Sequence, residues 1–346
     1  MKTDLRGLLP HEVEDLVVSL GEKKFRAKQL FSWVNKGVTS FDAMGNIPKT
    51  LREKLSGVAL VDNMEVVDVQ TSKDGTEKLL LKLIDGHMIE AVLMRYKHGV
   101  SVCISTQVGC RMGCTFCAST IGGMVRNVTA GELMGQIHLL GQRAGDRVSN
   151  IVLMGSGEPL ENLDEVLKFL EIVNHDQGLH VSMRHITLST CGLIPEIKAL
   201  ADKKLQLTLA VSLHASDDQT RSQLMPVNKK YNIQALLEAC RYYTDQTGRR
   251  VTFEYALIKG KNDGVQEAEK LGRLLKGLLC HVNLIPINPV KERGYDASSD
   301  GAIRTFQKKL KDMGIEATVR RELGSDINAA CGQLRKKHQD EMEPMA

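Results

Sequence analysis

Residues 107–120 read QVGCRMGCTFCAST, and this stretch decides the fold more than any other part of the chain. Its three cysteines, Cys110, Cys114 and Cys117, have the spacing Cys-x-x-x-Cys-x-x-Cys. Just before them, residues 102–105 (VCIS) form a short apolar, β-branched run that is typical of a strand. The sequence therefore predicts a loop that follows a strand and carries three thiols for metal or redox chemistry.

Three thiolates on one loop suit a 4Fe-4S cluster. Each would bind one iron of the cube and leave the fourth iron open, whereas a closed zinc site or an electron-transfer cluster takes four ligands. An open iron can bind the amino and carboxylate groups of S-adenosylmethionine (SAM) and pass one electron to its sulfonium. The alternative is a zinc knuckle completed by Cys103 or a distant histidine, because ligand softness does not exclude zinc.

Five more strand-like runs follow the cysteine loop, and helical stretches separate them. The runs lie at residues 150–155 (NIVLMG), 185–190 (HITLST), 207–213 (LTLAVSL), 251–258 (VTFEYALI) and 281–287 (HVNLIPI). Six strands that alternate with helices predict an α/β fold with a parallel sheet, either open or closed into a partial barrel. In both forms, ligands bind at the carboxyl ends of the strands.

Polar residues stand at these strand ends and are candidates for binding a cofactor. In MGSGEP (residues 154–159), glycines allow close backbone approach to a ligand, and Glu158 offers a carboxylate to an ammonium group. Taken alone, each candidate is more often a cap or loop residue, and His214 could be a structural histidine. The candidates are Gly157, Glu158, Ser189, Ser212, Leu213, His214 and Asn288.

The chain before the cysteine loop has two parts. Residues 1–62 read as short helices, and the helix expected at 23–37 carries five basic residues around an apolar stripe. That helix is either a solvated face over a small core or a surface that contacts RNA. Residues 63–97 change to an alternating pattern that predicts a hairpin-rich linking segment. Residues 98–334 form the main domain, and the polar tail 335–346 is expected to be disordered.

Composition places the chain among cytoplasmic globular proteins. Of its 346 residues, 42% are hydrophobic and 25% charged, and no run approaches the roughly 20 apolar residues of a membrane span. The N-terminus lacks an apolar signal core. In a reducing compartment, Cys191, Cys240 and Cys280 read as small buried apolar residues. The net charge of +4 permits an RNA partner without requiring one.

The cysteine loop at the start of a (β/α) domain resembles the signature of the radical SAM superfamily. This resemblance implies a partial (β/α)6 barrel, one 4Fe-4S cluster and SAM. The superfamily holds the amino group of SAM with a GGE-like motif, which Gly157 and Glu158 match. Across almost the whole chain, segments such as FRAKQLFSWV, GEPLEN, MPVNKKYNI, NLIPINPV and SDINAACGQLR resemble the RlmN/Cfr family of radical SAM RNA methyltransferases. GEP in place of GEA favours the branch that methylates carbon 2 of adenine over the branch that methylates carbon 8.

The resemblance to this family implies roles for three further residues. Cys331 would be methylated by one SAM, a second SAM would supply a radical, and Cys103 would resolve the protein–RNA adduct through a disulfide. Glu90 would accept the proton of the ring carbon, although its position alone predicts a solvent-facing strand residue. The implied substrates are adenosine 2503 of 23S rRNA and adenosine 37 of tRNA. A flavodoxin or ferredoxin would donate electrons to a monomeric enzyme. The open alternatives are carbon-8 methylation and a non-catalytic zinc-dependent RNA-binding protein.

Overall fold

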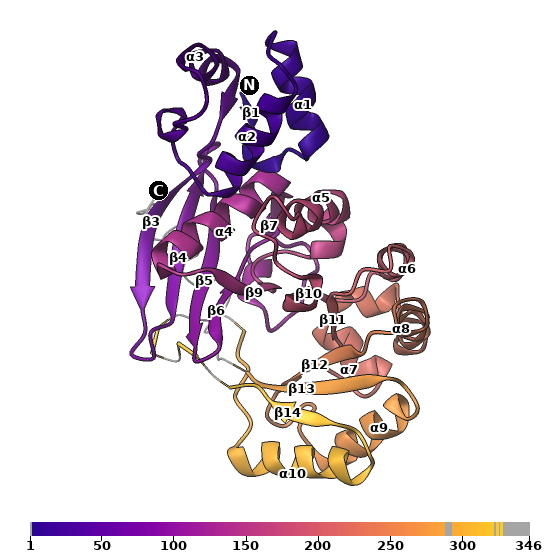
Figure 1. Ribbon diagram of the computed structural model, residues 1–346. Coiled ribbons are helices and arrows are strands. Elements are labelled where there is room, and N and C mark those ends of the chain that lie inside the picture. Colours follow the sequence, from indigo (N-terminus) through magenta and orange to yellow (C-terminus); the bar gives the residue numbers. More distant parts are fainter. Residues whose placement is uncertain (1, 288–292, 322, 325, 328–346) are drawn as a thin grey trace.

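A ten-stranded sheet forms the centre of the molecule (Figure 1). The structure is a computed structural model that describes residues 2–287, 293–321, 323–324 and 326–327. The strand order is β14-β13-β12-β11-β10-β9-β6-β5-β4-β3. These strands are β3 (Met64–Thr71), β4 (Glu77–Leu83), β5 (Met88–Tyr96), β6 (Gly99–Cys103), β9 (Val148–Leu153), β10 (Ile186–Thr190), β11 (Thr208–Ser212), β12 (Val251–Leu257), β13 (Cys280–Pro286) and β14 (Ala317–Val319).

Within this sheet, β6 and β9 to β14 are parallel, and the helices that connect them cover the sheet. All six predicted strands are confirmed as β6 and β9 to β13. Residues 317–319 add a seventh parallel strand, β14, beside β13. The helices are α4 (Ala130–Ala144), α5 (Leu163–Asn174), α6 (Ile194–Asp202), α7 (Asp218–Leu224), α8 (Ile233–Thr247), α9 (Val265–Leu275) and α10 (Asp300–Asp312).

The predicted hairpin segment is part of this same sheet. β3, β4 and β5 pair antiparallel as expected, and β5 also pairs antiparallel with β6. The linking segment therefore extends the sheet beyond the barrel strands (Figure 1). A local alternating pattern predicts hairpins but not their partner strand, because the pairing of β5 with β6 is decided by tertiary packing.

The N-terminal helices pack against the barrel through α4 and α5. They are α1 (Pro10–Ser19), α2 (Phe25–Asn35) and α3 (Lys49–Val58), and a short parallel pair, β1 (Thr3–Asp4) and β2 (Ala59–Leu60), accompanies them. Gln142 on α4 donates to the carbonyl of Gly37 at 2.5 Å, and Lys168 on α5 bonds Glu12 at 2.8 Å. One apolar core runs from Leu5 into the barrel. Within the described part of the chain, no helix has the length and apolarity to cross a membrane.

Helix α4 fixes the chain that leads into the cysteine loop. It begins with a capping box, in which Thr129 and Glu132 exchange side-chain and backbone hydrogen bonds, and it ends at a left-handed Gly145. Its buried Gln136 accepts from the Ser105 backbone N–H at 2.9 Å and donates to the Ser105 carbonyl at 3.0 Å. The segment between β6 and the loop is therefore held by a fully buried pair of hydrogen bonds.

Candidate active site

The cysteine loop lies between β7 (Gln107–Gly109) and a 3-10 turn at Ala118–Thr120. Gly109 has a φ of +80°, and a Cβ there would stand 2.0 Å from the Gly123 carbonyl oxygen, so this tight return needs glycine. The hydroxyl of Thr120 donates to the carbonyls of Cys114 and Cys117 at 3.2 and 2.9 Å. The loop conformation is thus set by the protein's own hydrogen bonds.

The three cysteines of this loop are close enough to affect one another electrostatically. Burial raises the pKa of Cys110 to about 12, and the charges of Cys117 and Glu158 act in the same direction. Burial also raises the pKa of Cys114, where the other two thiols add to the effect. Three neighbouring thiolates in a buried site therefore need a positively charged group to be stable, which is what an iron-sulfur cluster provides.

The donor set of this loop suits a 4Fe-4S cluster. Three soft thiols on one loop can each bind a different iron of a cube and leave the fourth iron open, whereas a zinc knuckle needs four ligands at about 2.0–2.3 Å from one centre. Among the described residues, no group of three His, Cys, Asp or Glu side chains is placed to hold a single metal ion. Cys110, Cys114 and Cys117 are the residues that would hold the cluster.

A pocket adjoins the partly exposed Cys117 at the carboxyl ends of the strands. It brings together three of the residues expected to bind the cofactor, Ser189, Ser212 and His214, from β10 and β11 and their ends. The remaining lining residues are Phe116, Cys117, Ala118, Met154, Glu254, Ala256, Ile285, Pro286, Ile287 and Arg320. The sequence therefore predicted part of this pocket, on the expected face of the sheet.

His214 is held in one tautomer. It has a φ of +55°, and its Nδ1 accepts from the Ala256 backbone N–H at 2.9 Å, so Nε2 carries the proton. Burial, followed by the positive charge of Arg221, lowers the pKa of His214 to about 3. Its ring meets the edge of Phe116, with centroids 4.9 Å apart. His214 is thus a neutral donor packed against the cysteine loop.

Glu254 is a pocket residue that sequence reasoning missed. It is 4% exposed, and burial raises its pKa, with Arg320 and Asn283 opposing the shift. Its carboxylate accepts from the Asn283 amide at 3.2 and 3.3 Å. The available signal was an acid inside the apolar run VTFEYALI, since a buried carboxylate needs a partner or a function.

Gly157 and Glu158 follow β9 and pack against Gln107 on β7, the strand that leads into the cysteine loop. Gly157 has a φ of +111°, and a Cβ there would lie 2.6 Å from the Cβ of Gln107, so the close approach is to the protein's own chain. The Glu158 carboxylate accepts from the backbone N–H groups of Cys191 and Leu160 at 2.7 and 3.0 Å. Burial raises the pKa of Glu158. Neither residue lines the pocket, and the side chain of Leu213 is fully buried in the main core.

Glu90 and Cys103 lie on neighbouring strands and on one face of the sheet. Residues paired across strands share a face, as do residues two apart along a strand. Cys103 on β6 and Lys78 on β4 both pair with Val92 on β5, and Glu90 precedes Val92 by two residues. The Lys78 ammonium is 3.0 Å from the Glu90 carboxylate, and the two side chains are 0% and 3% exposed. The prediction that Glu90 faces solvent is therefore wrong.

The same face continues into the pocket. Cys103 also pairs with Val152 on β9, and Val152 pairs with Thr187 on β10. Ser189 lies two residues after Thr187 on β10 and pairs with Ala210 on β11. Ser212 lies two residues after Ala210, so its side chain is on the same face. Ser212 pairs with Glu254. The register thus defines one polar sheet face, made of Lys78, Glu90, Cys103, Ser189, Ser212 and Glu254.

Two of the predicted site residues, Asn288 and Cys331, lie outside the described residues. The chain just before Cys331 is described at two points. Asp326 accepts from the Lys73 backbone N–H at 3.1 Å and contacts the Ser72 hydroxyl, and the Gly324 N–H donates to Asp74 at 2.9 Å. Gly324 and Asp326 are therefore held at the β3–β4 turn, next to the strand that carries Lys78.

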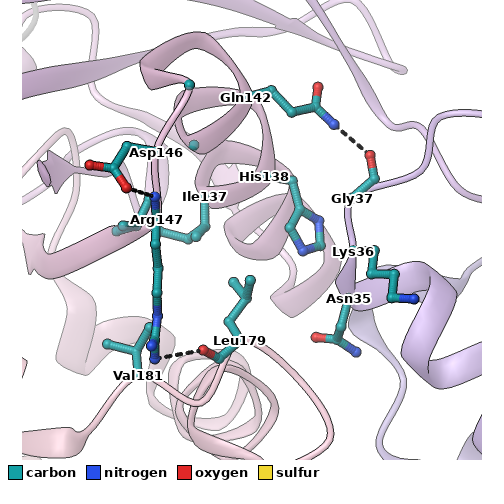
Figure 2. Close-up of a pocket in the computed structure, with 13 residues that line it drawn as sticks. Asn35, Lys36, Gly37, Ile137, His138, Gln142, Asp146, Arg147, Leu179 and Val181 are labelled. Carbon is teal, nitrogen blue, oxygen red and sulfur yellow. Dashed lines mark hydrogen bonds between the residues drawn. The ribbon is translucent and has the colours of Figure 1, made fainter.

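A separate pocket of about 310 Å³ lies between α2 and α4 (Figure 2). Figure 2 shows His138 of α4 pointing toward the end of α2, and Arg147 donating to the Leu179 carbonyl at 3.2 Å. Among the described residues, neither ring nitrogen of His138 has a hydrogen-bond partner, and the side-chain amide oxygen of Asn35 has none either. Such groups are commonly satisfied by ordered water. No residue predicted for the active site lines this pocket.

Comparison with known proteins identifies the class. The sequence model of the radical SAM superfamily matches residues 104–272, and a crystal structure of a radical SAM methyltransferase from Sphaerobacter thermophilus superposes with a TM-score of 0.93. That chain is 44% identical, and the match covers 96% of this chain and 98% of the other. The protein is a radical SAM enzyme with the α/β partial barrel that its cysteine loop predicted.

The family within that class follows from two further matches. The ribosomal RNA large subunit methyltransferase N-terminal domain matches residues 3–61. A relative from Alkaliphilus oremlandii, named "Probable dual-specificity RNA methyltransferase RlmN", is 57% identical over 97% of this chain and 98% of its own. A relative of the same name from Clostridium perfringens is also 57% identical, over 94% and 95%. The chain belongs to the RlmN family of radical SAM RNA methyltransferases.

Proposed function

We propose that this enzyme methylates carbon 2 of adenine, at adenosine 2503 of 23S rRNA and at adenosine 37 of tRNAs. It would use two SAM molecules per turnover and pass the methyl group through Cys331. The observation that supports this most is the polar sheet face, which joins Glu90 and Cys103 to the pocket beside the cysteine loop. A proton acceptor, a thiol and a radical source on one face are what such a reaction needs.

The chain that leads to Cys331 is anchored near that face. Asp326 is held at the β3–β4 turn, and the five residues from there to Cys331 would span at most about 18 Å if fully extended. Lys78 lies two residues beyond Thr76, the last residue of the same turn. The anchoring of Gly324 and Asp326 therefore supports the proposed role of Cys331 at Glu90 and Cys103.

The chemistry explains why a protein thiol carries the methyl group. The electron-poor carbon 2 of adenine cannot attack the sulfonium methyl of SAM, whereas the Cys331 thiolate can, and it becomes S-methylcysteine. When bound, a cluster on Cys110, Cys114 and Cys117 would supply the electron that splits the second SAM and take one electron back from the RNA adduct. S-methylated Cys331 then gives up a hydrogen atom from its methyl group to the 5'-deoxyadenosyl radical that the second SAM releases, which becomes 5'-deoxyadenosine. The resulting methylene radical on Cys331 bonds to carbon 2.

Two residues of the polar sheet face then release the product. The Glu90 carboxylate accepts the proton that leaves carbon 2. The Cys103 thiolate attacks the Cys331 sulfur, and the resulting disulfide expels the methylene carbon with its electron pair. That carbon takes a proton and becomes the methyl group. The disulfide must be reduced before the next turnover.

The pocket beside Cys117 would hold SAM. Ser189, Ser212 and the Nε2–H of His214 offer hydrogen bonds, and Glu254 offers a carboxylate to an ammonium or hydroxyl group. Gly157, Glu158, Leu213 and Asn288 stay proposed SAM-binding residues, and Gly157 with Glu158 matches the motif that holds the amino group of SAM in the superfamily. Each of these roles is tested by SAM binding to the corresponding variant.

RNA would approach across the basic side of α2, with the target adenine unstacked from its loop to reach the pocket. Lys23, Lys24, Lys28 and Lys36 are exposed there, and Phe25 is 54% exposed among them. Cations interleaved with an aromatic ring suit phosphates and bases. We further propose a monomeric cytoplasmic enzyme that receives electrons from a flavodoxin or ferredoxin.

The deciding experiment uses anaerobically reconstituted protein with SAM, a low-potential reductant and unmodified 23S rRNA or tRNA. Nucleosides are then identified by mass spectrometry. We expect 2-methyladenosine from the native protein and from Cys280→Ala, a variant at the opposite end of the sheet, but none from Cys331→Ala. Detection of 8-methyladenosine alone would show that the enzyme methylates carbon 8 of adenine instead of carbon 2. Absence of methylated adenosine from both RNAs would overturn the proposal.

Metal analysis of the same preparations tests the radical step separately. We expect about four irons per chain in the native protein, as a 4Fe-4S cluster requires, and loss of that iron in Cys114→Ala. A protein that binds zinc and no iron after reconstitution would instead support a zinc-dependent RNA-binding role.

A further inference from the structure

The buried ion pair between Lys78 and Glu90 has no evident purpose in folding. Its atoms are 3.0 Å apart, and the two side chains are 0% and 3% exposed. Desolvating two charges costs several kcal/mol, and a well-packed apolar pair of similar volume often stabilises a protein as well or better. A buried ion pair is therefore weak evidence for stability, and its position on the polar sheet face points to a role in the reaction.

We propose that Lys78 is a positioning residue that holds the Glu90 carboxylate in place for its role as proton acceptor. This inference rests on the proposed function. The Lys78 ammonium lies 3.0 Å from one oxygen of the Glu90 carboxylate, and a charge-assisted hydrogen bond at that distance fixes the orientation of the carboxylate.

The strand register explains how Lys78 can contact Glu90 and lie on the same sheet face as Cys103. Lys78 and Cys103 pair with the same residue, Val92, from opposite sides, and Glu90 is next to Val92 on that face. The Glu90 carbonyl is also fixed, because it accepts from the Ser105 hydroxyl at 2.6 Å. The backbone that carries Glu90 is therefore held on one side by the approach to the cysteine loop, while Lys78 holds its carboxylate from the other.

The role of Lys78 is specific to one step. Methylation of the Cys331 thiolate by the first SAM and formation of the carbon–carbon bond take no proton from adenine. Only afterwards does the proton move from carbon 2 to the Glu90 carboxylate, which becomes a carboxylic acid while Lys78 remains an ammonium ion. Removing the charge of Lys78 should therefore stall the enzyme at the covalent protein–RNA adduct, after Cys331 has been methylated.

The test compares Lys78→Met, Lys78→Arg and Glu90→Gln with Lys82→Met, an exposed lysine on the same strand. Three signals are followed: methyl transfer from labelled SAM to the protein, the gel-shifted protein–RNA adduct, and released methyladenosine. For Lys78→Met we expect normal protein methylation, accumulated adduct and a loss of product of about 10²- to 10⁴-fold, the usual contribution of a general base. Lys78→Arg should recover much of the product, and Lys82→Met should match the native enzyme.

Two controls separate the possible failures. Cys103→Ala cannot resolve the adduct, so absence of adduct in this variant together with no product from the native enzyme would overturn the proposed function and this inference with it. If both behave as expected but Lys78→Met turns over like the native enzyme, only the inference is overturned. A loss of all three signals in Lys78→Met would show a structural role instead.

A double variant keeps the proposal testable if Lys78→Met folds poorly. Lys78→Met with Glu90→Gln removes both buried charges and leaves neither unpaired. If Lys78 acts only through Glu90, this double variant and Glu90→Gln alone must form product at the same rate, as in a double-mutant cycle. A further loss in the double variant would contradict the proposed route.

Discussion

His214 and His138 are buried histidines whose protonation opposes folding. Burial is the largest cause in both, and positive charge from Arg221 or Arg6 adds to it, so each pKa falls from 6.5 to about 3. Between these values the unfolded chain binds a proton that the folded protein does not. Both contributions to stability are therefore complete above about pH 6.5 and are lost progressively as the pH falls toward 3.

This linkage predicts a steep acid dependence of unfolding. As the pH falls through that range, each histidine should lower the free energy of unfolding by about 1.4 kcal/mol for every pH unit. Urea titrations from pH 7 to pH 4 measure the free energy of unfolding of the native protein and of His214→Gln. The carboxylates that titrate in the same range are present in both proteins, so the difference between the two slopes reports His214 alone. The variant should show the shallower slope, and the exposed His11→Gln should not. Parallel curves for native protein and His214→Gln would contradict the buried neutral state.

At the scale of single residues, chemistry was easier to predict than burial. The spacing of the three cysteines is a local feature of the sequence, and so is the position of Ser189 and Ser212 at strand ends. The structure has the cysteine loop after its strand and both serines at the ends of β10 and β11, as the sequence predicts. Lys78 and Glu90 were not found as a pair, because EKLLLKL reads as a strand with exposed charges. Their burial comes from neighbouring strands in the sheet, which a local pattern does not contain.

Among the elements, the β3–β4 turn does more than connect two strands. Asp74 accepts from the Gly324 backbone N–H, the largest cause that lowers its pKa to about 2, and Asp326 bonds back to Ser72 and Lys73. These bonds join the turn to the chain that leads to Cys331. They stay intact at neutral pH, because both carboxylates are ionised well below it.

Removing this anchor should separate activity from stability. Asp326→Ala should lower formation of methyladenosine several-fold while leaving the melting temperature nearly unchanged, because the hydrogen bonds of a solvent-exposed carboxylate contribute little to stability. Lys73→Ala is the matched control, since its backbone N–H and not its side chain makes the bond. Equal activity in Asp326→Ala and Lys73→Ala would show that the anchor does not position Cys331.

The elements also show which parts of the fold are readable from local sequence. All six predicted barrel strands form, because apolar β-branched runs between helices specify parallel strands locally. Two features were missed: the hairpins join the barrel through β5 and β6, and residues 317–319 add β14. Both depend on pairing between distant segments, and strand pairing of that kind leaves little local trace.

On the scale of the whole molecule, the N-terminal helices stand beside the barrel as a separate layer (Figure 1). Their apolar side is buried in the common core, with Leu30 and Phe31 at 0% and 2% exposed. The basic residues of α2 therefore face outward, as either interpretation of this helix requires. What distinguishes a solvated face from an RNA surface is the response of RNA binding to charge and salt.

An RNA surface on α2 predicts a defined change in that response. Lys23 and Lys28 are exposed, and neither takes part in an ion pair within the described part of the chain, so both charges are available to phosphates. Lys23→Ala with Lys28→Ala should weaken binding of a tRNA anticodon stem-loop and reduce the magnitude of the salt slope, d log K/d log[salt], by roughly 0.7–0.9 per lost contact. Filter binding between 50 and 200 mM salt measures both quantities.

The control for α2 removes the same charge from another part of the surface. Lys308 and Lys311 are exposed on α10, which packs against β14 at the other end of the sheet. Lys308→Ala with Lys311→Ala changes the net charge equally, so a general loss of attraction would affect both pairs alike. If only the α2 pair lowers the salt slope, RNA contacts that helix directly. If the two pairs behave the same, α2 is a solvated face and the RNA must reach the pocket by another route.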